Sequence, residues 1–256
     1  MERAIILAAG RGERLVHGKP YPKPLQSVAG IPLIVRVLRN LERSGIDEVG
    51  IVVGHLGQVL IDALSSIRFG LRLRFIWNHD YDKPNGTSLL AAKDFVRGPT
   101  FLLMSDHLWS LDLLQRVWNY PLRSDEAVLG VDFKIADCCD LEDATKVALH
   151  GDRIATIGKQ LEYYEALDSG VFRITESVIQ ALERVDGPEG CSLSQGIAQL
   201  ARQGKMRAVD VKDATWIDVD TPHAQRHAEN LLRRYGSALR PVPTRISVVD
   251  LPAPAE

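Results

Sequence analysis

Four basic side chains near the amino terminus have types and spacing that suit phosphate chemistry. Arg11, Arg14, Lys19 and Lys23 follow directly on the apolar run 4–9 in the stretch that begins "LAAGRGERL". A glycine-rich turn at the end of a strand exposes successive backbone N–H groups, which can hold a polyphosphate. The lysine of "PKPL" stands between two prolines and is therefore held on a stiff, extended backbone. The stretch predicts a binding site for an anion.

Two familiar phosphate-binding motifs do not fit this loop. The dinucleotide fingerprint requires a glycine where the chain has Leu15. A Walker loop requires a glycine and a hydroxyl residue where the chain has Glu13 and Pro20. What remains is the general ability of a glycine-rich turn to bind an anion through its backbone N–H groups. The structural alternative is that Gly10 and Gly12 serve only a tight exit from the strand.

A first candidate carboxylate stands at the end of an apolar run. In "FLLMSDHLW", residues 101–104 are apolar and are followed by Ser105, Asp106 and His107. In open α/β folds, ligands bind beyond the carboxyl ends of parallel strands, where Asp106 is expected to lie. The alternative is that Asp106 caps the helix that follows.

A second pair of carboxylates occurs in "WIDVDTP". Asp218 and Asp220 alternate along an extended segment, so both side chains are expected on the same side. Thr221 and Pro222 open a helix, so an N-cap role for Asp220 is the rival interpretation. Magnesium prefers one or two protein carboxylates together with substrate phosphates. We therefore predict a Mg²⁺ site formed by Asp106 with Asp218 or Asp220.

The elements that must position these residues alternate between strand and helix. Such alternation is typical of an α/β fold whose mixed, mostly parallel sheet is covered by helices on both faces. An amphipathic helix is expected after Pro32 and before Gly45. The predicted strands are 4–9, 48–54, 72–77, 100–105 and 126–132.

The pattern changes after residue 133, where shorter strands dominate. We predict a single domain, 1–235, with two halves that meet at about residue 133. A Pro-rich tail is predicted at 236–256. In the second half, 134–235, we expect two short strands joined at "HGDR", a strand in "ALDSGVFRI", a strand at 206–211, and helices at 175–184, 192–203 and 221–234.

The bulk composition excludes several classes of protein. A net charge of -2 and a pI near 6.4 argue against nucleic-acid binding by bulk electrostatics. The 3 cysteines are expected to be reduced thiols, which favours the cytoplasm. The apolar runs are far shorter than the ~20 residues of a membrane span, so no membrane insertion is expected. The histidines, among them His17, His55, His79 and His107, show no ligand spacing, and we expect structural or incidental roles for them.

The loop "LAAGRGERL" followed by "PKPL" resembles the amino-terminal signature of the nucleoside-triphosphate transferases that make activated sugars and polyols. The resemblance implies a Rossmann-like nucleotidyltransferase fold in which the glycine-rich loop wraps the triphosphate. Arg14 and Lys23 match the phosphate-contacting residues of that family. Asp106 and the closing "DVD" match its metal ligands, with the choice between Asp218 and Asp220 open.

Three further stretches, "KPNGTSLLAAKDF", "MSDH" and "LEDATKVAL", resemble the CTP:inositol-1-phosphate cytidylyltransferases over about residues 3–230. The chain departs from that family at Thr87, where a tyrosine or similar side chain is expected. By itself, Asn-Gly is only a turn signal. On this resemblance the nucleotide-binding residues are Leu7, Ala8, Ala9, Gly10, Arg11, Gly12, Lys23, Asn85, Gly86, Ser88 and Ser105.

The same resemblance implies that about 1–133 is a nucleotide-binding half and about 134–235 an acceptor-binding half. Thr145 and Lys146 match an acceptor-contacting position, and Lys159 matches the lysine that holds the acceptor's phosphate. Asp168 lies where relatives bind acceptor hydroxyls, and Asp218 is placed on the same side. A single surface lysine is usually only solvated, so the role of Lys159 comes from the resemblance.

The activity implied is cytidylyl transfer from CTP to inositol-1-phosphate with Mg²⁺, giving CDP-inositol and pyrophosphate. The catalytic residues expected are Arg14, Lys23 and Asp106. The alternatives are transfer to another phosphate, such as a hexose-1-phosphate with GTP or UTP or phosphocholine with CTP, and a catalytically silent nucleotide-binding regulatory module. A separate membrane CDP-alcohol transferase in phospholipid biosynthesis is the expected partner, and a homodimer is compatible with the resemblance.

Overall fold

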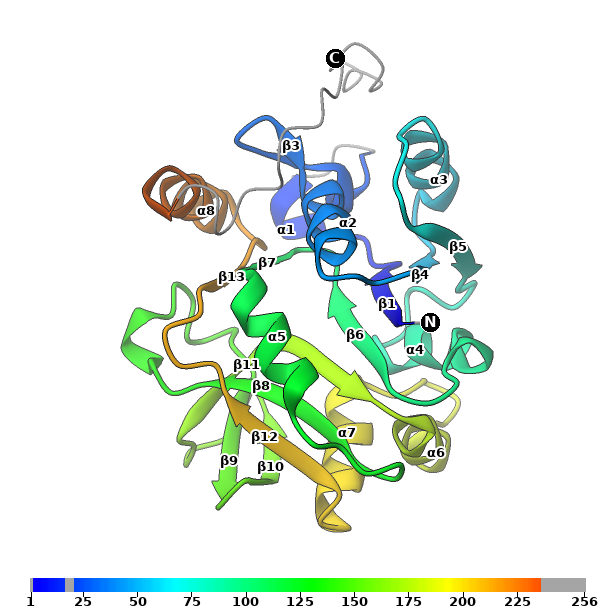
Figure 1. The fold of residues 1–256 in the computed structure, drawn as a ribbon. Helices are drawn as coiled ribbons and strands as arrows, with labels where there is room; N and C mark the ends of the chain where they lie inside the picture. The colour runs from blue at the N-terminus through cyan, green and yellow to red at the C-terminus, as the bar shows by residue number, and fades with distance from the viewer. Residues whose placement is uncertain (1, 17–20, 236–256) are drawn as a thin grey trace.

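The computed structural model of the protein describes residues 2–16 and 21–235 (Figure 1). His17, Lys19 and Pro20 lie outside the described residues, as does the tail predicted at 236–256. Within the described residues, no helix is both long and apolar enough to cross a lipid bilayer.

Four parallel strands form the amino-terminal part of the central sheet. Three of them are almost entirely buried, which is usual for parallel strands covered by helices on both faces, whereas the edge strand 72–77 is exposed or half-buried. The predicted boundaries are confirmed to within one residue. These strands are β1 (Arg3–Ala8), β4 (Glu48–Val53), β5 (Arg72–Trp77) and β6 (Thr100–Met104).

The carboxyl-terminal half extends the same sheet with mixed pairing. The strand β11 (Ala166–Ile174) is antiparallel to both β6 and β8 (Ala127–Asp132), whereas β12 (Met206–Asp210) is parallel to β8. The hairpin of β9 (Lys146–His150) and β10 (Arg153–Gly158) turns at the predicted "HGDR". The complete order is β5-β4-β1-β6-β11-β8-β12-β10-β9, so one mixed sheet runs through both halves of the chain.

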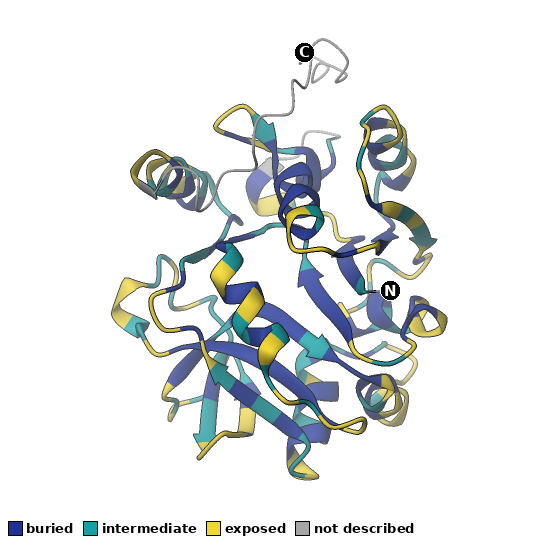
Figure 2. Ribbon diagram, in the orientation of Figure 1, coloured by how far each residue is buried: buried dark blue, intermediate teal, exposed yellow. Residues whose placement is uncertain are grey.

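Helices cover both faces of the sheet, as predicted. Successive side chains of a strand point to opposite faces, so Ile5 packs in one core cluster and Ile6 in the other. Figure 2 shows the central strands buried and the outer sides of the helices exposed. One face carries α4 (Gly86–Ala91), α6 (Glu176–Val185) and α7 (Leu193–Arg202), and the other carries α2 (Leu33–Arg43), α3 (Gly57–Ser65) and α5 (Leu111–Asn119).

A third apolar cluster attaches the last helix to the amino-terminal loop. The helix α8 (Pro222–Tyr235) packs Ala228 and Leu232 near Leu15 of α1 (Glu13–Val16). The cluster also contains residues of two small sheets and brings the segment before α8 close to the glycine-rich loop. The small sheets are β2 (Ser27–Val28) with β3 (Ile31–Pro32), and β7 (His107–Trp109) with β13 (Trp216–Asp218).

Candidate active site

A cavity of about 1450 Å³ lies beyond the carboxyl ends of β1 and β6. Residues of both halves of the chain line this cavity, which we call the cleft. Of the residues predicted from the sequence, Gly86 and Lys146 do not line the cleft. Those that do are Leu7, Ala8, Ala9, Gly10, Arg11, Gly12, Arg14, Lys23, Asn85, Ser88, Ser105, Asp106, Thr145, Lys159, Asp168, Asp218 and Asp220.

The glycine-rich loop allows a lysine to pass beneath it. Gly12 has a φ of 62°, which favours glycine, and a Cβ at this position would collide with the side chain of Lys23. By contrast, a Cβ on Gly10 would meet nothing within 4 Å. Gly12 therefore does more than end a strand, because its missing side chain makes room for Lys23.

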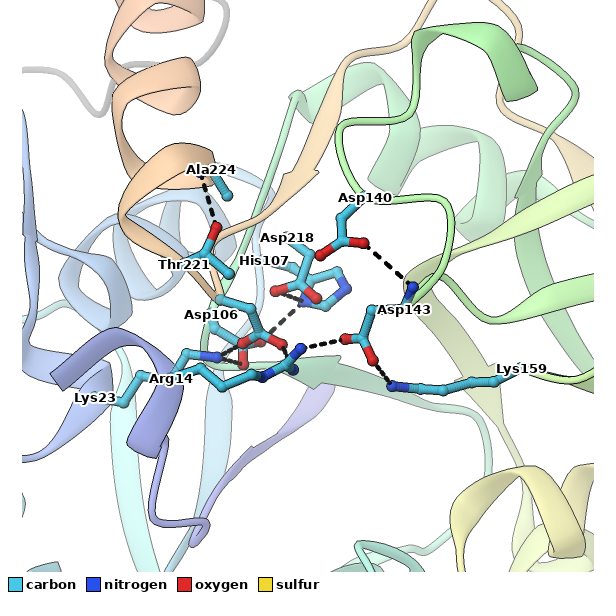
Figure 3. Close-up of polar contacts among 11 residues, drawn as sticks. Arg14, Lys23, Asp106, His107, Asp140, Asp143, Lys159, Asp218, Thr221 and Ala224 are labelled. Atoms are coloured by element: carbon cyan, nitrogen blue, oxygen red, sulfur yellow. Dashed lines mark hydrogen bonds and ion pairs between the residues drawn. The ribbon is translucent and has the colours of Figure 1, made fainter. Parts of the chain in front are cut away.

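Lys23 is a buried cation between two carboxylates. The extended backbone expected for Lys23 between its two prolines is wrong, because Lys23 begins the short 3₁₀ helix η1 (Lys23–Leu25) and only the preceding Pro22 is extended. The side chain of Lys23 is only 9% exposed. Its Nζ lies 2.6 Å from Oδ2 of Asp106 and also contacts Oδ1 of Asp220. Figure 3 shows Lys23 and Arg14 reaching the same group of carboxylates. The ammonium thus neutralises acidic groups that come from distant parts of the chain.

Asp106 is free to act in the cleft because it caps no helix. It is followed by β7, and the next helix, α5, has Ser110 at its N-cap, so the capping interpretation is wrong. Burial by itself would raise the pKa of Asp106, but the charge of Lys23 and a hydrogen bond with His107 outweigh it. The pKa of this carboxyl is therefore held well below its usual range. Asp106 is an anion at neutral pH.

Asp220 does not cap a helix either, so its carboxylate is available to the cleft. The hydroxyl of Thr221 accepts a hydrogen bond from the backbone N–H of Ala224 at 3.1 Å, so Thr221 caps the start of α8 (Figure 3). Asp220 instead contacts Lys23 with one oxygen and Arg14 with the other. The rival interpretation of Asp220 as an N-cap is therefore wrong.

Asp218 offers an oxygen without a hydrogen-bond donor. Its Oδ1 is buried, makes no hydrogen bond to a described residue, and lies 3.8 Å from Nδ1 of His107. Burial and the nearby charge of Asp106 raise the pKa of Asp218. A buried acceptor of this kind is costly unless a cation or donor completes it.

His107 has a defined place that the sequence did not reveal. Its Nδ1 lies 2.8 Å from Oδ1 of Asp106, and its ring stacks on that of Trp216 at 6.1 Å between centroids. A Cβ on Gly170, where φ is 74°, would collide with the imidazole. Burial alone would lower the pKa of His107, but the charges of Asp218 and Asp106 raise it to about 9.

The half predicted to bind the acceptor contributes its own charged groups. The amide of Gly170 donates to Oδ1 of Asp168 at 2.7 Å, and burial raises the pKa of Asp168 to about 6. Lys146 does not line the cleft, and its Nζ donates to the carbonyl of Lys159 at 2.7 Å and lies over the ring of Tyr164. Lys146 therefore supports the main chain that carries Lys159.

A carboxylate that the sequence did not single out joins the two halves. Asp143 Oδ2 accepts a hydrogen bond from Arg14 at 2.8 Å, and its Oδ1 lies 2.5 Å from Nζ of Lys159 (Figure 3). Burial tends to raise the pKa of Asp143, but the hydrogen bonds from Lys159 and Arg14 lower it overall. Asp143 is therefore ionised at neutral pH.

The segment predicted to face the base is held by its own contacts. Oδ1 of Asn85 accepts from the backbone N–H of Leu193 at 2.9 Å, and the hydroxyl of Ser88 accepts from Nδ2 of Asn78 at 2.9 Å. A Cβ on Gly86 would collide with the carbonyl of Cys191, so this glycine allows α4 to approach the start of α7. Asn85 and Ser88 line the cleft in fixed orientations.

Two groups of side chains bring carboxylates close enough to hold a divalent cation; His107, with its raised pKa, is protonated at neutral pH and contributes charge rather than a ligand atom. One group is Asp106, His107 and Asp218, and the other is Asp143, Asp218 and Asp220, with possible ligand atoms within 4.8 Å of one another. Carboxylate oxygens are the ligands that hard cations prefer. The unsatisfied Oδ1 of Asp218, which is common to both groups, fits the same requirement.

The MobA-like NTP transferase domain family matches residues 4–135, which include the glycine-rich loop, Lys23 and Asp106. The chain belongs to this family. The matched segment contains all of the residues that were predicted from the sequence to bind the nucleotide.

Similar proteins extend the comparison beyond residue 135. The chain is 36% identical over 233 residues to a bifunctional IPC transferase and DIPP synthase of Rubrobacter xylanophilus, covering 90% of this chain and 51% of the relative. A protein of the same name from Thermococcus kodakarensis is 32% identical over 234 residues, covering 91% and 51%. The chain therefore spans about half the length of these curated relatives.

A solved structure shares the fold across nearly the whole chain. The inositol-1-phosphate CTP transferase from T. maritima superposes with a TM-score of 0.80 at 25% sequence identity, covering 94% of this chain and 98% of that one. The agreement confirms the predicted Rossmann-like nucleotidyltransferase fold for this member of the MobA-like family.

Proposed function

We propose that this protein transfers a cytidylyl group from CTP to inositol-1-phosphate, giving CDP-inositol and pyrophosphate. One observation carries the proposal. A single cleft joins the cations and carboxylates of the glycine-rich side, Arg14, Lys23 and Asp106, to Lys159 and Asp168 of the other half. The names of the similar proteins, an IPC transferase and an inositol-1-phosphate CTP transferase, support the choice of nucleotide and acceptor.

The chemistry requires positioning more than proton transfer. A phosphate monoester has a second pKa of ~6 and is already mostly dianionic at neutral pH, so it needs no general base to become a nucleophile. The obstacle is repulsion between this anion and the triphosphate. Arg14 and Lys23 would hold the triphosphate and Lys159 the acceptor's phosphate, so that attack on the α-phosphorus is in line with departing pyrophosphate.

Magnesium fits the donor set of the cleft. Asp106 together with Asp218 or Asp220 would hold Mg²⁺, since hard oxygen ligands and an unsatisfied buried oxygen lie in this group. When bound, the ion would supply positive charge that offsets the negative charge of the reacting phosphates. Lys23 would then turn from the carboxylates toward the triphosphate.

The remaining site residues have supporting roles in this proposal. The backbone of the glycine-rich loop would wrap the triphosphate, and Asn85, Ser88 and Ser105 would face the nucleoside. Thr145 would contact the acceptor, and Asp168 would accept hydrogen bonds from its hydroxyl groups. Lys146 would act only through Lys159, because its ammonium binds the main chain there.

The setting of the reaction is proposed from the chain's chemistry and its relatives. Three free thiols, at Cys138, Cys139 and Cys191, suit the cytoplasm. CDP-inositol would be consumed by a CDP-alcohol transferase in a membrane during phospholipid biosynthesis. The relatives' names, which join an IPC transferase to a DIPP synthase, support such a pairing of activities.

The test is a panel of CTP, UTP, GTP and ATP against inositol-1-phosphate, glucose-1-phosphate, mannose-1-phosphate and phosphocholine, read by pyrophosphate release with Mg²⁺. We expect CTP with inositol-1-phosphate to exceed every other pair by at least about tenfold in kcat/KM. Asp106→Ala is the negative control, with an expected loss of about 10²–10³-fold. A different best pair would overturn the substrate assignment. Tight CTP binding without pyrophosphate release from any pair would instead identify a silent regulatory module.

A further inference from the structure

One carboxylate spans the cations of the two sides of the cleft. The two oxygens of Asp143 are used separately, one by Nη1 of Arg14 at 2.8 Å and the other by Nζ of Lys159 at 2.5 Å. Arg14 belongs to α1 and Lys159 follows β10, so the two cations come from opposite halves of the chain. Figure 3 shows Asp143 between these two side chains.

The two cations are those that the proposed function assigns to substrate phosphates. A carboxylate that receives a guanidinium on one oxygen and an ammonium on the other has the contacts that two oxygens of a phosphate group would make. We infer that Asp143 is an internal anion that holds Lys159, the cation of the acceptor-phosphate subsite, against Arg14 of the triphosphate side, and that the acceptor's phosphate must displace it. The inference rests on the proposed function, because that function makes Lys159 a phosphate ligand.

The contacts of Asp143 are of a kind that a phosphate can replace. The side chains of Arg14 and Lys159 are 52% and 49% exposed, and that of Asp143 is 30% exposed. Ion pairs this open to water contribute little to stability. A phosphate monoester carries about −1.5 to −2 charges on three acceptor oxygens, against a single charge on a carboxylate, so it is the stronger partner for the same cations.

The cations themselves would stay in place during the exchange. Arg14 keeps its second contact, from Nη2 to Asp220. The main chain of Lys159 is held by Nζ of Lys146. Asp143 lies in a connection outside the helices and strands, between η3 (Ile135–Asp137) and β9. The carboxylate of Asp143 is therefore the group that moves in the exchange, while the two cations stay in position.

This arrangement would select the chemical class of the acceptor. A neutral polyol cannot displace an ionised carboxylate from two cations, and a carboxylic acid gains nothing by exchanging one carboxylate for another. A phosphate or phosphonate monoester can. Asp143 is thus a specificity-determining residue that favours dianionic acceptors.

The test measures binding of inorganic phosphate to the free protein by calorimetry, in EDTA and without nucleotide. Asp143→Asn keeps the size of the side chain and removes its charge, and we expect phosphate to bind about fivefold tighter. Asp140→Asn is the matched control. Asp140 also lines the cleft, but among the described residues its side chain accepts a hydrogen bond from the amide of Asp143 and pairs with neither Arg14 nor Lys159, so we expect less than a twofold change.

A double variant localises the effect. In Asp143→Asn combined with Lys159→Ala, the gain should disappear, because the vacated cation is also gone. Three results would overturn the inference. They are unchanged or weaker phosphate binding by Asp143→Asn, an equal gain in Asp140→Asn, and no measurable phosphate binding by the parent protein or by Asp143→Asn. If the gain is found but inositol-1-phosphate is not a substrate, the proposed function fails and the inference stands. If transfer occurs without the gain, the inference alone fails.

Discussion

The Nζ of Lys23 lies 2.6 Å from Oδ2 of Asp106 and also contacts Asp220, so one buried ammonium joins two carboxylates from distant parts of the chain. The carboxylates belong to the segments that follow β6 and β13. Without a positive charge between them, Asp106 and Asp220 would repel each other in a site largely shielded from water. Lys23 therefore has a structural role in the free protein in addition to its proposed role on the triphosphate.

Lys23→Met should separate these two roles, because methionine keeps the apolar stem and removes the charge. In EDTA we expect a loss of about 2–4 kcal/mol in the free energy of unfolding, since two carboxylates lose their shared partner. Added Mg²⁺ should raise the Tm of the variant more than that of the parent protein, because the ion replaces the missing charge. Lys93→Met, at an exposed lysine paired with Glu183, is the control. Equal Mg²⁺ responses in all three proteins would contradict this account.

Gly12→Ala should damage the same region by a steric route. The positive φ and the contact with Lys23 both oppose a side chain, so we expect a stability loss of about 1–3 kcal/mol and a weakening of CTP binding. For stability, Gly10→Ala is the matched control, because its Cβ would meet no protein atom within 4 Å. CTP binding by Gly12→Ala is compared with the parent protein, since Gly10 also belongs to the loop proposed to wrap the triphosphate. Chemical denaturation of the two variants, and CTP titration of Gly12→Ala and the parent protein, test these comparisons. Similar losses of stability in both variants would show that the effect is not specific to Gly12.

Asp168→Asn should change the pH dependence of stability. Burial raises the pKa of Asp168 to about 6 in the folded protein, against ~3.9 in an unfolded chain. The folded state therefore keeps a proton that the unfolded state loses, and this contribution to stability disappears as the pH rises from about 4 to about 6. Asparagine cannot ionise, so the variant should gain about 2 kcal/mol relative to the parent between pH 4 and pH 7. Urea unfolding of both proteins in EDTA at pH 4 and pH 7 measures this change in the free energy of unfolding. A difference between the two proteins that does not vary with pH would argue against a raised pKa.

The sequence predicted the sheet and its helices well because their signals are local. Apolar runs such as 48–53 and the amphipathic stripe of α2 need only their own residues to be recognised. Figure 1 confirms that these elements form one mixed sheet with helices on both faces. The glycine-rich loop and Lys23 were likewise identified, because a glycine turn and a lysine between prolines are short patterns.

The parts of the site that sequence reasoning missed depend on contacts between distant residues. Asp143 pairs with a residue 129 positions away, and no local pattern announces that contact. The strand β7, which makes Asp106 free of any helix, is only 3 residues long and exists through its pairing with β13. The position of His107 depends on Gly170 and Trp216. For His107, the one signal in the sequence was its place directly after Asp106 at the end of a strand.

Lys159→Ala should affect one substrate and leave the other unchanged. We expect the KM for inositol-1-phosphate to rise about 10–100-fold, because a charge-assisted contact with its phosphate is lost. The KM for CTP should change by less than about twofold. Steady-state kinetics with each substrate varied in turn provide the measurement, and Lys93→Ala is the control at an exposed site. Equal effects on both KM values would remove Lys159 from the acceptor side.

The central claim is that Asp106 and the closing aspartates hold a divalent ion against a bound triphosphate. A crystal structure with Mn²⁺ and a non-hydrolysable CTP analogue tests it directly, because the anomalous signal locates the ion. We predict one strong peak bound to Asp106, to Asp218 or Asp220, and to an oxygen of the triphosphate, with Lys23 turned onto a phosphate. An ion bound away from Asp106, or a triphosphate with no ion between it and these carboxylates, would contradict the account.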